Sequence, residues 1–225
     1  MDRVIEYEIK KEYKDLWSFF KEKKYPKSLR TQLKQNPSQV QLNGKGTFLH
    51  EAMHIGDYLE ITIKENQKSS MNLKPLDVPI DVVYEDEDIL VVNKPAGMSI
   101  HPSVRHYEDS LANAILSYLE KKGENIIFRC VNRLDKETSG LTVIAKNMLA
   151  GAILSEEVKH KEMKREYRAL VCGEMDVDEN WHEVKAPIGR VEDSAILRCV
   201  REDGKEAITH YQVLAVKEGY SFLKL

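Results

Sequence analysis

The chain has 225 residues, of which 42% are hydrophobic and 32% are charged, with a formal net charge of -3. This is the composition of a globular protein with room for one large domain or two smaller ones. Its three widely spaced cysteines form no Cys-x-x-Cys pair, which argues against a disulfide framework and a thiolate zinc site. No apolar run approaches the ~20 residues of a membrane helix, and the charged N-terminus is unlike a signal peptide. We therefore expect a cytoplasmic protein without membrane contact.

The first 66 residues predict a small α+β module. Residues 4–9 alternate between apolar and polar and predict a strand, and Leu16, Phe19 and Phe20 follow at helical spacing. A second short helix is expected at residues 28–34. Strands are expected at residues 39–42 and 58–64, with turns at Asn43-Gly44 and Gly56-Asp57.

The charge of the chain is unevenly distributed. Residues 1–75 contain 14 Lys and Arg against 10 Asp and Glu, and the basic excess lies in residues 10–34. A basic segment is consistent with a polyanionic partner such as RNA. A solvated helix face has the same pattern, so charge alone does not decide between them.

One short motif points to a different class of protein. Residues 50–54 read HEAMH, which fits the H-E-x-x-H pattern of zinc proteases, in which two histidines one helical turn apart hold the metal. That pattern requires a long helix, whereas Gly44 and Gly46 precede His50 and Gly56 follows His54. We interpret the motif as a coincidence and expect no metal.

Residues 67–79 are polar, contain two prolines and are expected to form a linker. Beyond it, strands are predicted at 82–84, 89–93, 141–145, 168–172, 195–200, 209–216 and 220–225, and helices at 110–122 and 149–162. Strands outnumber helices and rarely alternate with them. This favours an α+β fold with a mainly antiparallel sheet, so residues 80–225 are expected to form the second domain.

Asp135 is the strongest candidate for a functional residue. The apolar residues Cys130 and Val131 precede it, a polar segment ending at Gly140 follows, and the apolar run 141–145 begins next. Such a carboxylate is held in a turn between two anchored strands, and catalytic groups concentrate in loops carried on a rigid scaffold. A structural turn aspartate fits the same pattern equally well.

Residues 132–141, NRLDKETSGL, resemble the signature of RluA-type pseudouridine synthases. Three further segments are similar to motifs of that family and occur in the same order. They are residues 86–103, DEDILVVNKPAGMSIHPS, residues 164–173, KREYRALVCG, and residues 204–211, GKEAITHY. The resemblance covers residues 76–225. The first 66 residues are similar, more weakly, to the small alpha-L RNA-binding module that often precedes such domains.

The resemblance implies an RNA pseudouridine synthase that needs no cofactor. It assigns the nucleophile to Asp135 and the aromatic residue that stacks on the target base to Tyr167. Arg133 would occupy the space left by the flipped base. The remaining implied substrate-binding residues are Asn132, Leu134 and Lys94. Ribosomal and transfer RNA are both compatible as partners, and we expect a monomer.

Three departures from the family pattern accompany these matches. Asn132 stands where the family usually has histidine, and Arg165 stands at the lysine position two before Tyr167. A segment reading roughly threonine-glycine-arginine-threonine-histidine-glutamine does not occur. Because the chain ends within a predicted strand, we expect the catalytic domain to be incomplete at its C-terminus, with an unpaired apolar edge on the last strand.

Two other function classes stay open at this stage. A non-catalytic RNA-binding or RNA-remodelling protein on the same fold would carry the same motifs. A glycosidase would need a second carboxylate, and nothing in the sequence selects Glu137 for that role.

Overall fold

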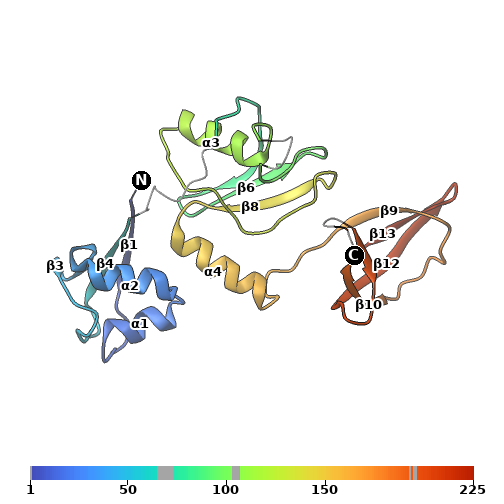
Figure 1. Ribbon diagram of the computed structural model, residues 1–225. Coiled ribbons are helices and arrows are strands. Elements are labelled where there is room, and N and C mark those ends of the chain that lie inside the picture. Colours follow the sequence, from blue (N-terminus) through green and yellow to red (C-terminus); the bar gives the residue numbers. More distant parts are fainter. Residues whose placement is uncertain (1, 65–72, 103–106, 193, 195–196) are drawn as a thin grey trace. The chain divides into compact units, whose positions relative to one another are not determined.

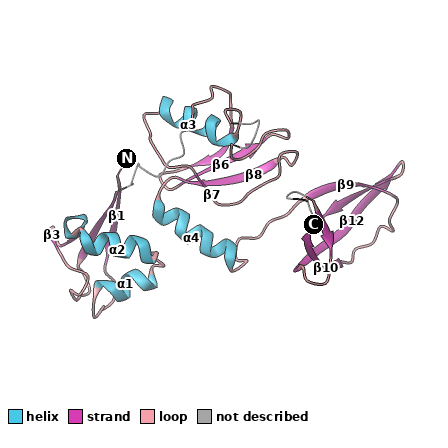
Figure 2. Cartoon of the chain, in the orientation of Figure 1, coloured by secondary structure: helices cyan, strands magenta, loops and turns pink. Residues whose placement is uncertain are grey.

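The structure, a computed structural model, describes residues 2–64, 73–102, 107–192, 194 and 197–225. The chain forms two compact units, Met1–Met163 and Lys164–Leu225. Within them lie three sheets, in which all neighbouring strands pair antiparallel (Figures 1 and 2). The predicted α+β fold with mainly antiparallel sheets is confirmed.

The N-terminal part of the first unit has the predicted order of elements. Strand β1 is Arg3–Glu8, helix α1 is Leu16–Glu22, helix α2 is Lys27–Gln35 and a 3-10 turn, η1, is Pro37–Gln39. Strands β2 (Val40–Leu42), β3 (Lys45–Gly46) and β4 (Tyr58–Ile63) complete a sheet in the order β1-β4-β2-β3. The sequence did not predict β3, because two residues are too few to show a period.

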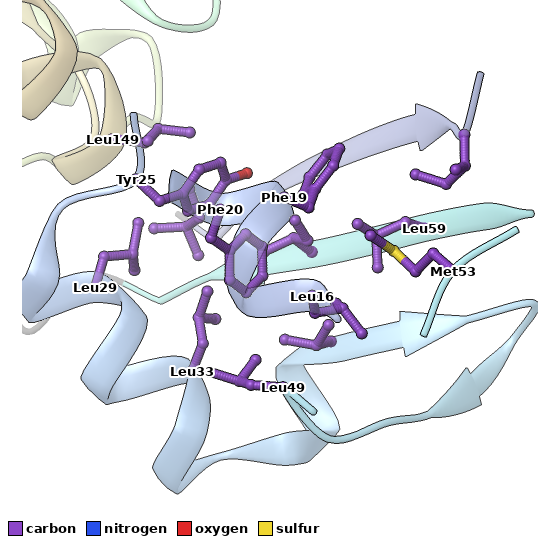
Figure 3. Packing of buried hydrophobic residues seen from close by; sticks show 14 residues of the cluster. Leu16, Phe19, Phe20, Tyr25, Leu29, Leu33, Leu49, Met53, Leu59 and Leu149 are labelled. Atoms are coloured by element: carbon purple, nitrogen blue, oxygen red, sulfur yellow. The ribbon is translucent and has the colours of Figure 1, made fainter. Parts of the chain in front are cut away.

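A single hydrophobic core stabilises this part. The side chains of α1 and α2 that recur at helical spacing, including Leu16, Phe20 and Leu33, are at most 2% exposed. They pack on alternate residues of β4, whose burial follows the period of two expected for a strand with one covered face. Figure 3 shows these side chains together with Leu149, which comes from the later helix α4 (Met148–Lys159). The N-terminal core is therefore completed by a residue far along the chain.

The rest of the first unit forms a second sheet. Its elements are β5 (Asp81–Glu85), β6 (Ile89–Lys94), α3 (Leu111–Lys121), β7 (Arg129–Cys130), β8 (Gly140–Ala145) and α4 (Met148–Lys159). The strands lie in the order β5-β6-β8-β7. Apolar residues of α3 pack on Leu90 and Val92 of β6 and on Ile144 of β8, forming a core separate from the N-terminal one.

The segment predicted as a linker lies partly outside the described residues, which resume at residue 73. Its described part contains no helix or strand but is attached to α3. The backbone N–H of Leu76 donates to the carbonyl of Asn113 at 3.1 Å, and the Asn113 amide donates to the carbonyl of Lys74 at 2.8 Å. Residues 74–76 thus pack along the helix.

A partly buried ion-pair cluster ties one end of this sheet to α3. The Lys146 ammonium lies 2.6 Å from Glu124 and 3.1 Å from Glu85, and Lys122 and Tyr118 donate to Glu85 at 2.7 Å. Burial acts to raise the pKa of Glu85. The hydrogen bonds from Lys122, Tyr118 and Lys146 outweigh it and lower the pKa from 4.5 to about 2.

This cluster predicts a loss of stability in acid. The ionised Glu85 contributes stability above pH 4.5, and that contribution is lost as the pH falls toward 2. The total is about 3 kcal/mol, of which about 2 kcal/mol disappears between pH 6 and pH 3. Urea unfolding gives the difference in unfolding free energy between the parent and Glu85→Gln. This difference should be about 2 kcal/mol smaller at pH 3 than at pH 6. The exposed Glu120 on α3 provides a matched control, because Glu120→Gln should follow the parent at every pH.

The second unit is a five-stranded sheet. Its strands are β9 (Arg168–Cys172), β10 (His182–Arg190), β11 (Arg198–Val200), β12 (Lys205–Lys217) and β13 (Tyr220–Lys224), in the order β11-β10-β12-β13-β9. The prediction of an unpaired edge on the last strand is wrong, because β13 pairs with β12 on one side and β9 on the other.

Strand β10 was missed because it contains Pro187 and Gly189 and shows no regular alternation of burial. The strand predicted at residues 195–200 is shorter, since β11 begins at Arg198, and residues 195 and 196 lie outside the described residues. Among the helices described, none is long and apolar enough to cross a membrane.

Candidate active site

The register of β6 and β8 brings two loops to the same end of the second sheet. Lys94, the last residue of β6, pairs with Gly140, the first residue of β8. The chain therefore leaves β6 into residues 95–101 at the point where residues 131–139 enter β8. We call residues 94–98 the lysine loop and residues 135–138 the aspartate turn.

Asp135 opens the aspartate turn and is exposed to solvent. Its backbone carbonyl accepts from the N–H of Thr138 at 3.1 Å, which closes the turn. The Asp135 carboxylate makes no hydrogen bond or ion pair with any residue in the described part of the chain. It is thus positioned by its backbone while its oxygen atoms face solvent, as a nucleophile that must reach a substrate requires.

Lys94 holds the two loops together from inside. Its side chain is fully buried, and its ammonium donates to the carbonyls of Pro95 and Met98 at 2.8 Å and of Lys136 at 3.0 Å. The backbone N–H of Gly97 donates to the same Lys136 carbonyl at 2.9 Å. Gly97 has φ +83, a left-handed conformation that favours glycine and lets its N–H reach this acceptor. Two donors of the lysine loop thus fix the residue that follows Asp135.

Burial lowers the pKa of Lys94, and the negative charges of Glu137 and Asp135 oppose that shift. The ammonium therefore lies within Coulombic range of both carboxylates although it hydrogen-bonds to neither. A substrate contact was expected for Lys94. The structure instead places its charge beneath the aspartate turn, out of reach of solvent.

Asn132 and Leu134 also anchor the segment around Asp135. Asn132 is 8% exposed; its amide donates to the carbonyl of Leu141 at 3.0 Å and accepts from the N–H of Val143 at 2.8 Å. The Asn132 side chain therefore hydrogen-bonds to the backbone of β8 in the way that a neighbouring strand would. Leu134 is half-buried against the core beneath α3. The two side chains on either side of Arg133 thus point inward and tie the segment to the sheet.

Arg133 is exposed between these two anchors, and its positive charge acts on His101, which was not among the predicted site residues. Burial, and then the positive charge of Arg133, lower the pKa of His101, at the far end of the loop that begins with Lys94. His101 packs edge-on against Phe128 with ring centroids 5.3 Å apart. The only sequence signal for His101 was its position within the motif of residues 86–103.

Tyr167 belongs to the second unit, so its proposed contact with the target base stays a prediction. It precedes β9, is half-buried, and its backbone N–H and carbonyl each pair with Leu225 at 3.0 Å. Five of the six predicted site residues, all but Tyr167, lie together around the aspartate turn of the first unit.

The H-E-x-x-H segment has no helix, so His50 and His54 do not share a helix face. His54 Nδ1 lies 2.7 Å from Glu12, and His50 stacks on Phe48 with ring centroids 5.7 Å apart. The described residues contain no group of three or more His, Cys, Asp or Glu placed to hold a metal ion.

The comparisons with known proteins all indicate the same family. Residues 88–225 match the family described as RNA pseudouridylate synthase. The uncharacterized RNA pseudouridine synthase YjbO of Bacillus subtilis is 37% identical over 199 residues, which are 88% of this chain and 69% of that protein. Ribosomal large subunit pseudouridine synthase D of Escherichia coli O6:H1 is 34% identical over 176 residues, 78% of this chain and 53% of that protein.

A solved structure supports the fold. Human RNA Pseudouridylate Synthase Domain Containing 1 aligns over 68% of this chain and 61% of that chain, with a TM-score of 0.53 and 23% identity. The chain spans about half to two thirds of the length of these proteins. The matched region contains the aspartate turn, the segments that anchor it and the sheet of the second unit. The chain belongs to the RNA pseudouridylate synthase family, as its RluA-type motifs indicated.

Proposed function

We propose that this protein isomerises uridine to pseudouridine in structured RNA, with Asp135 as the nucleophile. The observation that carries the proposal is the aspartate turn, where an exposed carboxylate, without a hydrogen-bond or ion-pair partner among the described residues, is held in place by buried donors. Family membership supports the reaction, and this geometry supports the choice of Asp135.

The reaction breaks the bond between N1 of uracil and C1′ of ribose, rotates the base and forms a bond from C5 to C1′. The hydrogen on C5 leaves as a proton and the freed N1 takes up a proton, so the product is an isomer and no electrons are exchanged with a cofactor. The carboxylate of Asp135 must be ionised to attack, and the positive charge of Lys94 lies within Coulombic range of it. Attack on the ring and attack on the sugar both fit this arrangement.

A uridine in folded RNA must leave its stack before it meets Asp135, which costs a few kcal/mol. Arg133 is exposed next to Asp135 on the same loop and suits the role of filling the vacated space. We assign base stacking to Tyr167, because aromatic stacking contributes about 1–3 kcal/mol per base. Asn132, Leu134 and Lys94 act as positioning residues in this scheme.

The name of the Escherichia coli relative favours ribosomal RNA as the substrate class. We propose a monomeric cytoplasmic enzyme that acts on ribosomal RNA, with transfer RNA as the alternative substrate. We also propose residues 1–66 as an alpha-L-like RNA-binding module and residues 80–225 as part of the catalytic domain.

The test is release of tritium from RNA labelled at C5 of uridine, because formation of the new carbon–carbon bond expels that hydrogen. Ribosomal RNA and transfer RNA are assayed separately with this chain and with a chimaera that continues after Leu225 with the corresponding residues of the Escherichia coli relative. Release from one RNA class identifies the substrate. RNA binding by the chimaera without release from either class would favour the non-catalytic alternative.

A further inference from the structure

A hollow of about 430 Å³ lies on the N-terminal part of the first unit, outside the candidate active site. Two of its aromatic rings are stacked, since Phe48 and His50 lie 5.7 Å apart at an interplanar angle of 15°. Phe48 is 58% exposed, a large fraction for an aromatic side chain. The residues that line the hollow are Asp15, Trp17, Lys34, Phe48, Leu49 and His50.

The loop that carries Phe48 and His50 is held rigidly. The backbone N–H of Trp17 donates to the carbonyl of Leu49 at 3.1 Å, and the N–H of Thr47 donates to Val40 at 3.0 Å. Leu49 is 8% exposed and is one of the core side chains drawn in Figure 3. Thr47 and Leu49 are buried whereas Phe48 and His50 are exposed, so the anchored loop directs these two rings outward. The aromatic pair is thus presented to solvent at a fixed position.

One basic residue, Lys34 of helix α2, lines the hollow. Helix α2 has three basic residues, Lys27, Arg30 and Lys34, and no acidic one. Their spacing of three and four places them along one face of the helix, while Leu29 and Leu33 face the core. The single carboxylate at the hollow, Asp15, accepts from the N–H of Ser18 at 2.6 Å and so caps α1. Its charge is partly offset by the positive end of that helix.

Arg30 of helix α2 packs on Trp17, which is one of the residues that line the hollow. Its guanidinium carbon lies 4.6 Å from the ring centroid of Trp17. The Nε and Nη1 atoms are buried and have no hydrogen-bond partner among the described residues, so the ring is the contact that orients the group. Trp17 itself lines the hollow, so a ring that carries a planar cation on one face lies beside the stacked Phe–His pair.

We propose that this hollow binds an unpaired base of the RNA substrate. The base stacks on the outer face of the Phe48–His50 pair, and the adjoining phosphate contacts Lys34. Aromatic faces beside a cationic side chain are the features that bind single-stranded nucleic acid without reading its sequence. The inference rests on the proposed function only in taking RNA as the partner, and it adds a binding site separate from the aspartate turn.

The first experiment measures affinity by fluorescence anisotropy, with the full chain and a fluorescein-labelled 12-nucleotide oligoadenylate. Phe48→Ala should weaken binding by roughly fivefold or more, because a stacking surface is lost, and should leave the salt dependence unchanged. Lys34→Ala should also weaken binding and should reduce the salt slope by about 0.7, as expected for one phosphate contact on a single strand. Ile55→Ala, which removes a 66% exposed apolar side chain of the same part but outside the hollow, is the matched control.

The second experiment reports on the hollow itself. The chain has two tryptophans, so Trp181→Phe leaves Trp17 as the only one. Titration with the 12-mer should then change the emission of Trp17, and annealing the 12-mer to its complement should abolish that response, because duplex RNA hides its base faces. Equal affinity of Phe48→Ala and parent, or unchanged Trp17 emission at saturation, overturns the proposal. Either of these two results is also what we would expect if the hollow binds an apolar peptide instead of RNA.

These outcomes separate the binding site from the catalytic proposal. Asp135→Asn should bind the 12-mer as tightly as the parent, since Asp135 is not among the residues that line the hollow. If no tritium is released but the 12-mer still changes the emission of Trp17, the catalytic proposal is wrong and the RNA site in the hollow is supported. If Phe48→Ala releases tritium and binds the 12-mer with parental affinity, the proposed site in the hollow is wrong and the catalytic proposal stands.

Discussion

Asp135→Asn should reduce tritium release by roughly 10⁴-fold or more, because removing a catalytic nucleophile leaves only binding and positioning. The replacement has the same shape and keeps the backbone carbonyl that closes the turn with Thr138. The side chain is exposed and has no partner among the described residues, so the free energy of unfolding should change by no more than about 0.5 kcal/mol. Tritium release and urea unfolding, measured on the same preparations, check both parts.

Glu137→Gln is the matched control for this variant. Glu137 is a second exposed carboxylate in the aspartate turn, two residues further on, and it acts on Lys94 as Asp135 does. Neutralising it should leave tritium release within a few-fold of the parent. Substantial release by Asp135→Asn would refute the assignment of the nucleophile. Equal loss in both variants would indicate that the turn needs its negative charge rather than one particular carboxylate.

Lys94→Met should inactivate the folded enzyme by displacing Asp135. The variant removes the ammonium that donates to the carbonyls of Pro95, Met98 and Lys136 and leaves these acceptors buried. Loss of charged hydrogen bonds and burial of unpaired carbonyls should lower the free energy of unfolding by about 2–4 kcal/mol. Because the aspartate turn loses its internal support, kcat should fall by roughly 100-fold or more while KM for RNA stays close to the parental value.

Lys146→Met separates a displaced active site from general destabilisation. Lys146 is also a buried lysine, and it is adjacent to the opposite end of β8, where it pairs with Glu85 and Glu124. Its loss should cost about 3–5 kcal/mol, because two carboxylates lose their buried partner. At a temperature where both variants are folded, Lys146→Met should keep kcat and Lys94→Met should not. Parental kcat in folded Lys94→Met would contradict the positioning role.

Much of the site could be predicted because its signals are local. Asp135 stands between two apolar runs and is followed by Gly140, so a turn at this point follows from residue types within ten positions. The order of elements in residues 1–66 follows equally from alternation, helical spacing and the Asn43-Gly44 and Gly56-Asp57 turns. Short or irregular strands such as β3 and β10 were missed because they carry no period.

The sequence by itself determined the α+β class, the family and the candidate nucleophile, since each depends on residues close together in the chain. Only the tertiary structure decided what those residues contact. Lys94 and Lys136 are 42 positions apart, and their contact exists because β6 and β8 pair in one register. Pairing also places β13 inside its sheet, and the backbone hydrogen bond from Trp17 to Leu49 brings the exposed Phe48 and His50 beside Trp17. Long-range backbone pairing determines such neighbours, and no local pattern records it.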